Sequence, residues 1–294
     1  MKNIKYHLLS LLVTALVAGS FLSSAELSGV VNPFSLTLLR FLLAALMLLP
    51  FILIRPQRVE VAKRVFPRSL LMSLFFSVFF ICMFEALNTT TPLNTGTLYT
   101  LVPFITALTG SLIFKQRLSL KLFGVYILAA VGTCWVVAKG ELSVLLALGF
   151  NQGDFIFLLG CISMVFFSVS MKILNRGEES LVTVFCILVG GIIWMTLALI
   201  VFQQPLGWSA ITIGLAAHMM YLAFFATLVS TYIIHTTTVV LGPTKVMAYI
   251  YLSPVFVAII MFIFKGQHIP IAVYPGIILS VVCTILLQVF NRRT

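Results

Sequence analysis

The chain has 294 residues, of which 61% are hydrophobic and only 9% charged, and its net charge is +11. Soluble domains are about 45–50% apolar and about 25% charged, so the composition excludes a water-facing fold and predicts an integral membrane protein. The five cysteines lie within or at the ends of apolar stretches and lack metal-type spacing. We therefore expect no disulfide framework and no metal site.

Ten stretches are long and apolar enough to cross a bilayer, which takes about 20 residues in a helix. They lie near 5–25, 34–54, 69–88, 94–114, 121–138, 154–172, 181–202, 214–237, 243–264 and 269–290. Unpaired backbone groups are costly in lipid, and these runs lack the alternation of a membrane β-barrel. The predicted fold class is all-α integral membrane, with ten transmembrane helices.

The first span has features of a secretory signal peptide. Lys2 and Lys5 precede an apolar stretch that ends in small residues at 23–25, and Glu26 follows. We favour a first transmembrane helix, because the repeat described below needs this span to complete the first half.

The second and third spans carry two ionisable residues. Arg40 lies about seven residues into the second span, and Glu85 lies near the outer end of the third. A charge at the bilayer centre costs roughly 2.5–3.5 kcal/mol, so such residues are functional candidates. We expect Glu85 or Glu26 to pair with Arg40, with substrate or a proton competing for that pairing. A purely structural ion pair is the alternative.

The fourth span contains Pro103 within TLYTLVPFITAL, and the ninth contains Pro254 within AYIYLSPVFVAI. Proline removes an N–H and kinks a helix, freeing a carbonyl that a cavity or a neighbouring helix must satisfy. Because the two prolines occur in corresponding spans, we favour helix kinks beside a central cavity over ordinary packing kinks.

Polar and aromatic residues near these prolines are candidate substrate contacts. A tyrosine offers a ring and a hydroxyl to an amphipathic ligand, and a tryptophan offers a ring to a cation. Two positions differ by about 200° around a helix, so we expect only one of Tyr249 and Tyr251 to face inward. The candidate set, together with Arg40 and Glu85, is Tyr99, Thr100, Trp135, Tyr249 and Tyr251.

The two halves of the chain resemble each other at an offset of 151 residues. Pro103 aligns with Pro254, and Gln116 with Gln267. Five spans per half is an odd number, so the halves have opposite orientations, as in many secondary transporters with a central site. The prediction is two inverted five-helix repeats, at 1–140 and 153–294, joined by a linker at 141–152.

His235 lies in the polar stretch IIHTTT near the inner end of the eighth span. A histidine changes charge near physiological pH, so His235 joins Glu85 and Glu26 as a candidate for proton coupling. A histidine hydrogen-bonded at a helix interface is the alternative. The sequence has no Walker motif and no nucleotide-binding glycine loop, so neither ATP as direct driver nor another cofactor is expected.

The basic residues indicate the orientation. With ten spans and a cytoplasmic N-terminus, 15 of the 18 Lys and Arg residues fall in inside segments, and Lys139 and Lys265 fall outside. This asymmetry fits the positive-inside rule and places both termini in the cytoplasm. Nucleic acid is not an expected partner, because no basic domain lies outside the membrane.

Three stretches resemble the EamA-type family of the drug/metabolite transporter superfamily. The region of the family's helices 3–5 is similar to ALNTTTPLNTGTLYTLVPFITALTGSLIFKQRLSLKLFGVYILAAVG. The matching region of its second half is similar to YLAFFATLVSTYIIHTTTVVLGPTKVMAYIYLSPVFVAIIMFIFKGQHIP. Its second helix, with an arginine that is Arg40 here, is similar to NPFSLTLLRFLLAAL. The resemblance implies ten helices, inverted repeats and a small-molecule carrier working by alternating access. Gln116 and Gln267 stand where the family usually has glutamates, which weakens any carry-over of substrate.

The expected function is secondary active transport of a small metabolite, such as an amino acid-like solute, or a drug across the bacterial inner membrane. A proton-coupled exporter leads, and an uptake carrier for an amino acid or purine-like compound is the alternative. An enzyme is not expected, since seven acids and four histidines are scattered along the chain. A receptor or scaffold would need a soluble domain. Substrate, direction, coupling ion and oligomeric state, monomer or homodimer, stay open.

Overall fold

The computed structural model describes residues 3–27, 29–87, 89–90, 95, 98–115, 119–147, 151–266 and 268–290. Within these ranges the chain is helical and forms no strand. Nine of the described helices are long and apolar enough to cross a membrane, and a tenth apolar helix is shorter. The predicted ten-helix membrane fold is confirmed. Gln116 and Gln267 lie outside the described residues.

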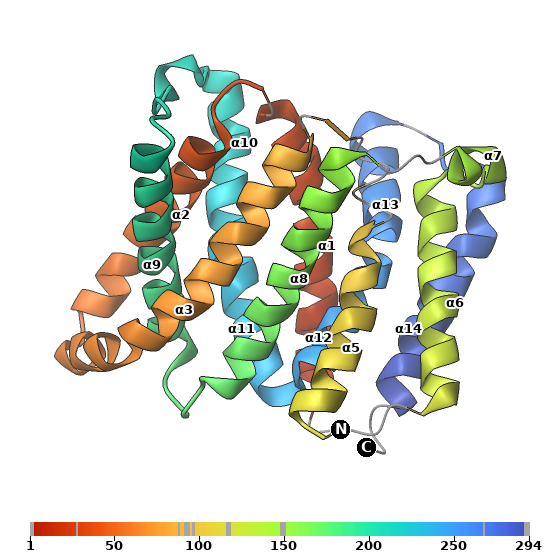
Figure 1. The fold of residues 1–294 in the computed structure, drawn as a ribbon, viewed down its shortest axis with the longest axis horizontal. Coiled ribbons are helices and arrows are strands. Elements are labelled where there is room, and N and C mark those ends of the chain that lie inside the picture. The colour runs from red at the N-terminus through yellow and green to blue at the C-terminus, as the bar shows by residue number, and fades with distance from the viewer. Residues whose placement is uncertain are drawn as a thin grey trace.

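The first half supplies five spans to the bundle in Figure 1. Its third helix begins at Pro56, although the sequence predicted a polar connection over 55–68, and Pro67 lies inside it. The turns before Pro67 carry the basic residues Arg58, Lys63 and Arg64. The helices of this half are α1 (Ile4–Leu27), α2 (Pro33–Leu53), α3 (Pro56–Leu87), α5 (Leu101–Ile113) and α6 (Leu120–Val137).

The second half also supplies five spans, and two of them are built from several segments. The eighth span contains a π-helical turn, and the ninth contains a 3₁₀ stretch. A short helix, α7 (Leu142–Leu146), precedes this half. The segments are α8 (Gln152–Ile173), α9 (Ser180–Val201), α10 (Ile213–Ala223), η2 (Phe224–Val229), α11 (Ser230–Leu241), α12 (Pro243–Met247), η3 (Ala248–Leu252), α13 (Ser253–Lys265) and α14 (Tyr274–Phe290).

The helix contacts follow the inverted-repeat plan. Helix α3 packs on α8, and the equivalent contact after exchange of the halves is that of α1 with α10 and α11. Helix α5 also packs on α8, and the equivalent contact is that of α1 with α13. Three further pairs join equivalent spans of the two halves, namely α2 with α9, α5 with α12, and α6 with α14. Exchanging the halves maps each of these contacts onto another of them or onto itself. The repeat limits 1–140 and 153–294 stay predictions.

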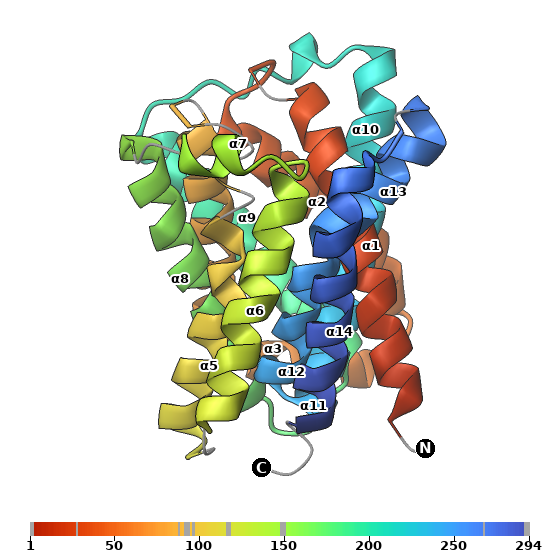
Figure 2. The same ribbon diagram turned by 90° about the vertical axis from the view of Figure 1, so that its right-hand side faces the viewer.

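The start of α1 and the end of α14 lie at the same end of the bundle, as Figures 1 and 2 show. The α2–α3 corner and the α8–α9 connection lie at that end too (Figure 1). We call it the terminal end.

Close helix packing depends on glycine at several crossings. A Cβ added to Gly190 would lie 2.3 Å from Oγ of Ser73 on α3, and one on Gly191 would lie 2.6 Å from Cδ2 of Phe41 on α2. The pair therefore lets α9 approach α2 and α3 closely, as small residues do in membrane helices.

Candidate functional site

A cavity of about 80 Å³ lies between the two halves of the molecule. Both halves line it: the first through α1, α2, α3 and Tyr99, the second through α8 and the eighth and ninth spans. Its wall is mostly aromatic and aliphatic, with a few hydroxyls. The hydroxyl-bearing lining residues, besides Tyr99, are Thr14, Ser20, Ser24, Ser230 and Ser253.

Arg40 supplies the positive charge in this cavity. Its side chain is 2% exposed, and its Cζ lies 4.5 Å from the centre of the Phe80 ring. A guanidinium over an aromatic face is attracted by the ring quadrupole. Its Nε and Nη2 donate to Oγ1 of Thr227 at 3.2 and 3.0 Å. An aromatic face and one hydroxyl thus hold the cation in place.

Local structure explains where these partners lie. Asn32 caps α2 by accepting from the backbone N–H of Phe34 at 2.9 Å, which fixes the helix two turns before Arg40. Thr227 lies in the π-helical turn η2. A π-turn inserts an extra residue and shifts the helix face, and such turns are frequent at functional sites. The shift directs the hydroxyl of Thr227 to α2.

The expected ion pair between Arg40 and Glu85 or Glu26 is not formed. Both carboxylates belong to exposed residues at the ends of their helices, and within the described ranges no acidic group lies within 4 Å of Arg40. The side chain of Arg40 points inward, whereas the two glutamates lie on outward-facing positions. The structure therefore separates the charges that the sequence suggested would meet.

The aromatic candidates divide between the cavity and the packed core. Tyr99 lines the cavity, but Tyr251 is fully buried and donates to the carbonyl of Tyr126 at 3.3 Å. Tyr249 is also buried, and its hydroxyl is hydrogen-bonded to Nδ1 of His7 at 2.7 Å. Neither Tyr249 nor Tyr251 lines the cavity. Inward-facing positions on the 3₁₀ stretch thus serve packing between helices.

Thr100 and Trp135 also lie away from the cavity. The hydroxyl of Thr100 is 3.8 Å from Sγ of Cys134. Trp135 donates from Nε1 to the carbonyl of Ala272 at 2.7 Å, which ties α6 to the chain before α14. Both residues make their hydrogen bonds on the side of the bundle that α5, α6 and α14 form.

The two prolines lie in the first turns of helices. Pro103 is the third residue of α5, after a turn at Thr100, and Pro254 is the second residue of α13, after η3. A proline in the first turn removes an N–H that has no partner within the helix. A turn at Thr100 and the 3₁₀ stretch η3 therefore precede the two prolines, and the predicted kinks stay a prediction.

His235 is fully buried on α11, outside the cavity lining. Both its ring nitrogens lack a hydrogen-bond partner among the described residues, as do the hydroxyls of Thr231 and Thr238. Residues four before and three after His235 share its helix face. Together the three residues form a buried polar strip beside Ile234, which does line the cavity.

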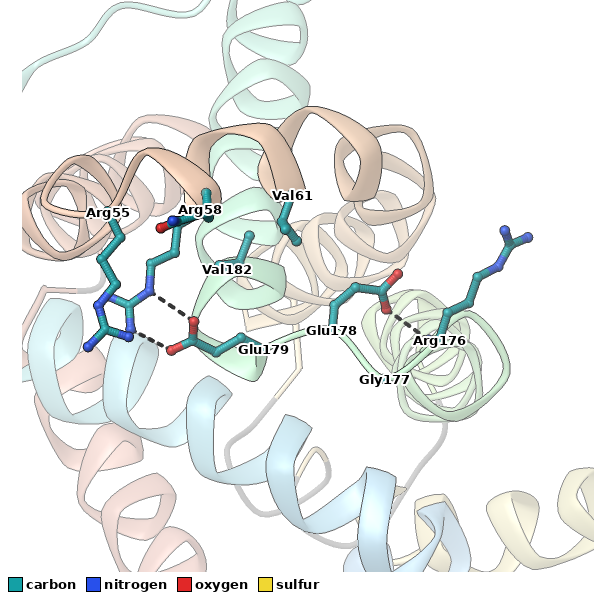
Figure 3. Close-up of a pocket in the computed structure, with 9 residues that line it drawn as sticks. Arg55, Arg58, Val61, Arg176, Gly177, Glu178, Glu179 and Val182 are labelled. Carbon is teal, nitrogen blue, oxygen red and sulfur yellow. Dashed lines mark hydrogen bonds and ion pairs between the residues drawn. The ribbon is translucent and has the colours of Figure 1, made fainter.

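A second, open hollow of about 420 Å³ lies at the terminal end, between the start of α3 and the α8–α9 connection. In Figure 3, Glu178 and Glu179 lie between Arg58 at one side and Arg176 at the other. Arg58 donates to both oxygens of Glu179 at 2.9 and 2.6 Å. Beside the hollow, Arg68 pairs with Glu178 at 2.5 Å. These two ion pairs join the halves at this end.

Sequence reasoning missed several residues of the cavity. Thr227 and Ser230 gave no signal, because hydroxyls are common in membrane helices. Phe79, Phe80 and Met83 read as ordinary apolar residues. The spacing of Phe76, Phe80 and Met83, at four and three residues, could have shown that they share one helix face. No group of three or more metal-binding side chains occurs in the described part of the chain.

Residues 4–138 match the EamA-like transporter family. The first half of the chain is thus similar to this transporter family. The match covers the first half, and two relatives extend the likeness along most of the chain. The uncharacterized transporter YyaM of Bacillus subtilis (strain 168) is 22% identical over 266 residues, covering 89% of this chain and 87% of its own. An uncharacterized transporter of Archaeoglobus fulgidus is 26% identical over 266 residues, covering 88% and 89%.

A solved crystal structure has the same fold. It aligns with a TM-score of 0.78 over 98% of both chains, at 18% identity. At that identity the likeness establishes the fold alone. The EamA-type resemblance expected from the sequence is confirmed, and the protein is a membrane transporter.

Proposed function

We propose that this EamA-like protein is a secondary active transporter that moves a small organic solute across the bacterial cytoplasmic membrane by alternating access. One observation carries the proposal: residues of both halves line one cavity, and the buried side chain of Arg40 is part of its wall. Inverted repeats place a central site at their interface, and rocking one half against the other exposes it to each side in turn.

The cavity is small in this structure. About 80 Å³ holds two or three water-sized volumes, each about 30 Å³. A larger solute would need the cavity to widen as one end opens. At the terminal end, opening would separate the Arg58–Glu179 and Arg68–Glu178 ion pairs.

We propose export coupled to protons moving inward. Glu85, Glu26 and His235 are the candidate proton-carrying residues; His235 lies in the buried polar strip beside the cavity. The basic residues favour cytoplasmic termini, and both termini lie at one end of the bundle (Figure 1). An uptake carrier uses the same cavity in the opposite direction.

The test is counterflow into liposomes that contain the purified full-length protein. Vesicles are loaded with unlabelled amino acids, nucleobases or short carboxylic acids, and entry of the labelled compound is followed. Accumulation of one class above that in protein-free vesicles supports the proposal. If a well-folded protein accumulates no class, secondary transport of these solutes is refuted.

Direction and coupling need a second measurement on the same vesicles. An imposed pH gradient, acidic on the side opposite the termini, should accelerate efflux from the terminal side at least severalfold. Acceleration of the opposite movement would identify an uptake carrier. A flux that is the same with and without the pH gradient would refute proton coupling.

A further inference from the structure

We infer that Arg40 docks the carboxylate of a compact organic monoanion, and that such monoanions are the solutes this transporter carries. The inference rests on the proposed function, because it treats the central cavity as the transport site. It adds the charge and size of the solute, which the family does not define for this chain.

The first support is that the counter-charge of Arg40 is missing from the protein. The chain has seven acidic residues, all within the described ranges, and none lines the cavity. Three make ion pairs with other basic side chains, one caps α8, and three are exposed. In that order they are Glu60, Glu178 and Glu179, then Asp154, then Glu26, Glu85 and Glu141.

The second support is the unused hydrogen-bonding capacity of the guanidinium. Arginine has five N–H donors in a planar fork, which matches a carboxylate through two parallel bonds. In the described structure the donors of Arg40 reach one acceptor, Oγ1 of Thr227. A buried charge without a counter-charge is unfavourable, so binding an anion to Arg40 is favourable.

The third support is the shape and chemistry of the surrounding wall. Phe79, Phe80, Met83 and Met164 line the cavity and offer apolar surface to the body of a solute. A cavity of about 150 Å³ accommodates benzene, and this one measures about 80 Å³. It therefore fits a branched or short chain of roughly three to five carbons.

The lining also discriminates against a zwitterion. The ammonium group of an amino acid would meet hydroxyls but no carboxylate, while Arg40 already places a positive charge in the cavity. Desolvating a cation there is unfavourable. A simple carboxylic acid anion should therefore bind better than the matching amino acid.

The experiment compares probes of one shape on the purified full-length protein in detergent at pH 7 and constant ionic strength. Isobutyrate, isobutyramide, isobutylamine and 2-aminoisobutyrate share a branched four-carbon skeleton and differ in charge. We expect a concentration-dependent rise in melting temperature with isobutyrate, and a rise at most one third as large with the other three. Nitrate controls for a bare anion and should have no such effect.

Variants assign the effect to Arg40. Arg40→Gln should abolish the isobutyrate shift, and Arg40→Lys should reduce it, because lysine keeps the charge but loses the fork. Arg176→Gln makes the same change in charge on an exposed side chain outside the cavity, and should retain the full shift. If Arg40→Gln does not fold, the inference is tested by the reduced isobutyrate shift of Arg40→Lys and by the comparison of the matched probes on the native chain.

Three results would overturn the inference: an equal shift with isobutyramide or nitrate, an undiminished shift in Arg40→Gln, or no shift with either isobutyrate or pyruvate. Flux separates this failure from failure of the proposed function. Arg40-dependent carboxylate binding without flux refutes transport and leaves the anion site standing. Flux of a neutral or cationic solute that Arg40→Gln leaves unchanged refutes the anion site and leaves transport standing.

Discussion

At the residue scale, the protein keeps a guanidinium in its interior without a carboxylate from the described chain. Thr227 and the Phe80 ring hold it, and both are weaker partners than an anion. Such a group lowers the stability of the empty protein and becomes favourable when an anion arrives. Two predictions with opposite signs follow from this arrangement.

Thr227→Val should destabilise the protein by about 1–2 kcal/mol, because the buried cation loses its hydroxyl acceptor. The measurement is thermal or denaturant unfolding in detergent. Thr237→Val is the matched control: Thr237 is equally buried on α11, and it donates only within its own helix, to the carbonyls of Ile233 and Ile234. Its effect should stay within about 0.5 kcal/mol. Equal losses in both variants would contradict the role given to Thr227.

Arg40→Met should leave the solute-free protein as stable as the native chain or more stable, because the variant removes a buried positive charge that has no carboxylate beside it. The melting temperature without added solute measures this, and flux in liposomes should fall to background. A clear drop in melting temperature would show that Arg40 is mainly a structural residue. Arg176→Gln again serves as the control, with unchanged melting temperature and flux.

At the element scale, two of the spans that line the cavity, the eighth and the ninth, are irregular. The eighth span contains the π-turn η2, and the ninth contains the 3₁₀ stretch η3 followed by Pro254. Freed backbone groups within a membrane need protein or water as partners. Regular helices elsewhere, such as α9 against α2 and α3, supply the rigid support by packing closely at glycines.

Gly191→Ala should destabilise the protein by roughly 1–3 kcal/mol through overpacking. The new methyl group would lie 2.6 Å from the ring of Phe41, which is fully buried and stacks on Phe76. Gly124→Ala on α6 is the control, because nothing lies within 4 Å of the added Cβ. Since alanine favours a helix over glycine by about 0.5–1 kcal/mol, this control should be neutral or stabilising. Unfolding measurements on both variants decide, and an unaffected Gly191→Ala would contradict the close α2–α9 packing.

At the scale of the whole molecule, the two halves contact each other differently at the centre of the bundle and at the terminal end. The centre is apolar with one cation, whereas the terminal end is held by the ion pairs Arg58–Glu179 and Arg68–Glu178. Burial raises the pKa of Glu178, but hydrogen bonds from Arg68 and from the backbone N–H of Arg176 outweigh that effect and hold the pKa below its ordinary value. The Arg68–Glu178 pair therefore favours the folded state while Glu178 is ionised.

Glu178→Gln should lower stability at pH 7 by about 0.5–1 kcal/mol, the range of a partly exposed ion pair. A lowered folded-state pKa contributes stability that is complete above the unfolded value, about 4.3, and is lost as pH falls through the folded value. The native chain and the variant should therefore converge in acid. Melting curves between pH 3.5 and 7 measure the difference. Glu141→Gln, at an exposed residue, should follow the native profile throughout, and parallel curves for Glu178→Gln would contradict the linkage.

The sequence by itself determined the class of the protein, its ten spans and the intramembrane position of Arg40. These follow from composition and segment length, because the polar backbone groups of an apolar segment in lipid must be hydrogen-bonded within the protein, and a helix does this within one segment. The repeated proline predicts kinks beside a central cavity, and this stays a prediction, because neither Pro103 nor Pro254 lines the cavity. Residues 55–68 fall between two expected spans, because an amphipathic segment does not resemble a membrane span, although α3 begins at Pro56.

The tertiary structure alone decided what Arg40 meets. Thr227 is 187 residues away in the chain, and the π-turn that carries it shifts the face of its helix, so no local pattern could pair the two. The same reason explains why Tyr249 and Tyr251 pack in the core and Glu85 faces outward. A side chain's direction depends on small changes of helical pitch and on which neighbour packs against it, and neither is written in the spacing of one segment.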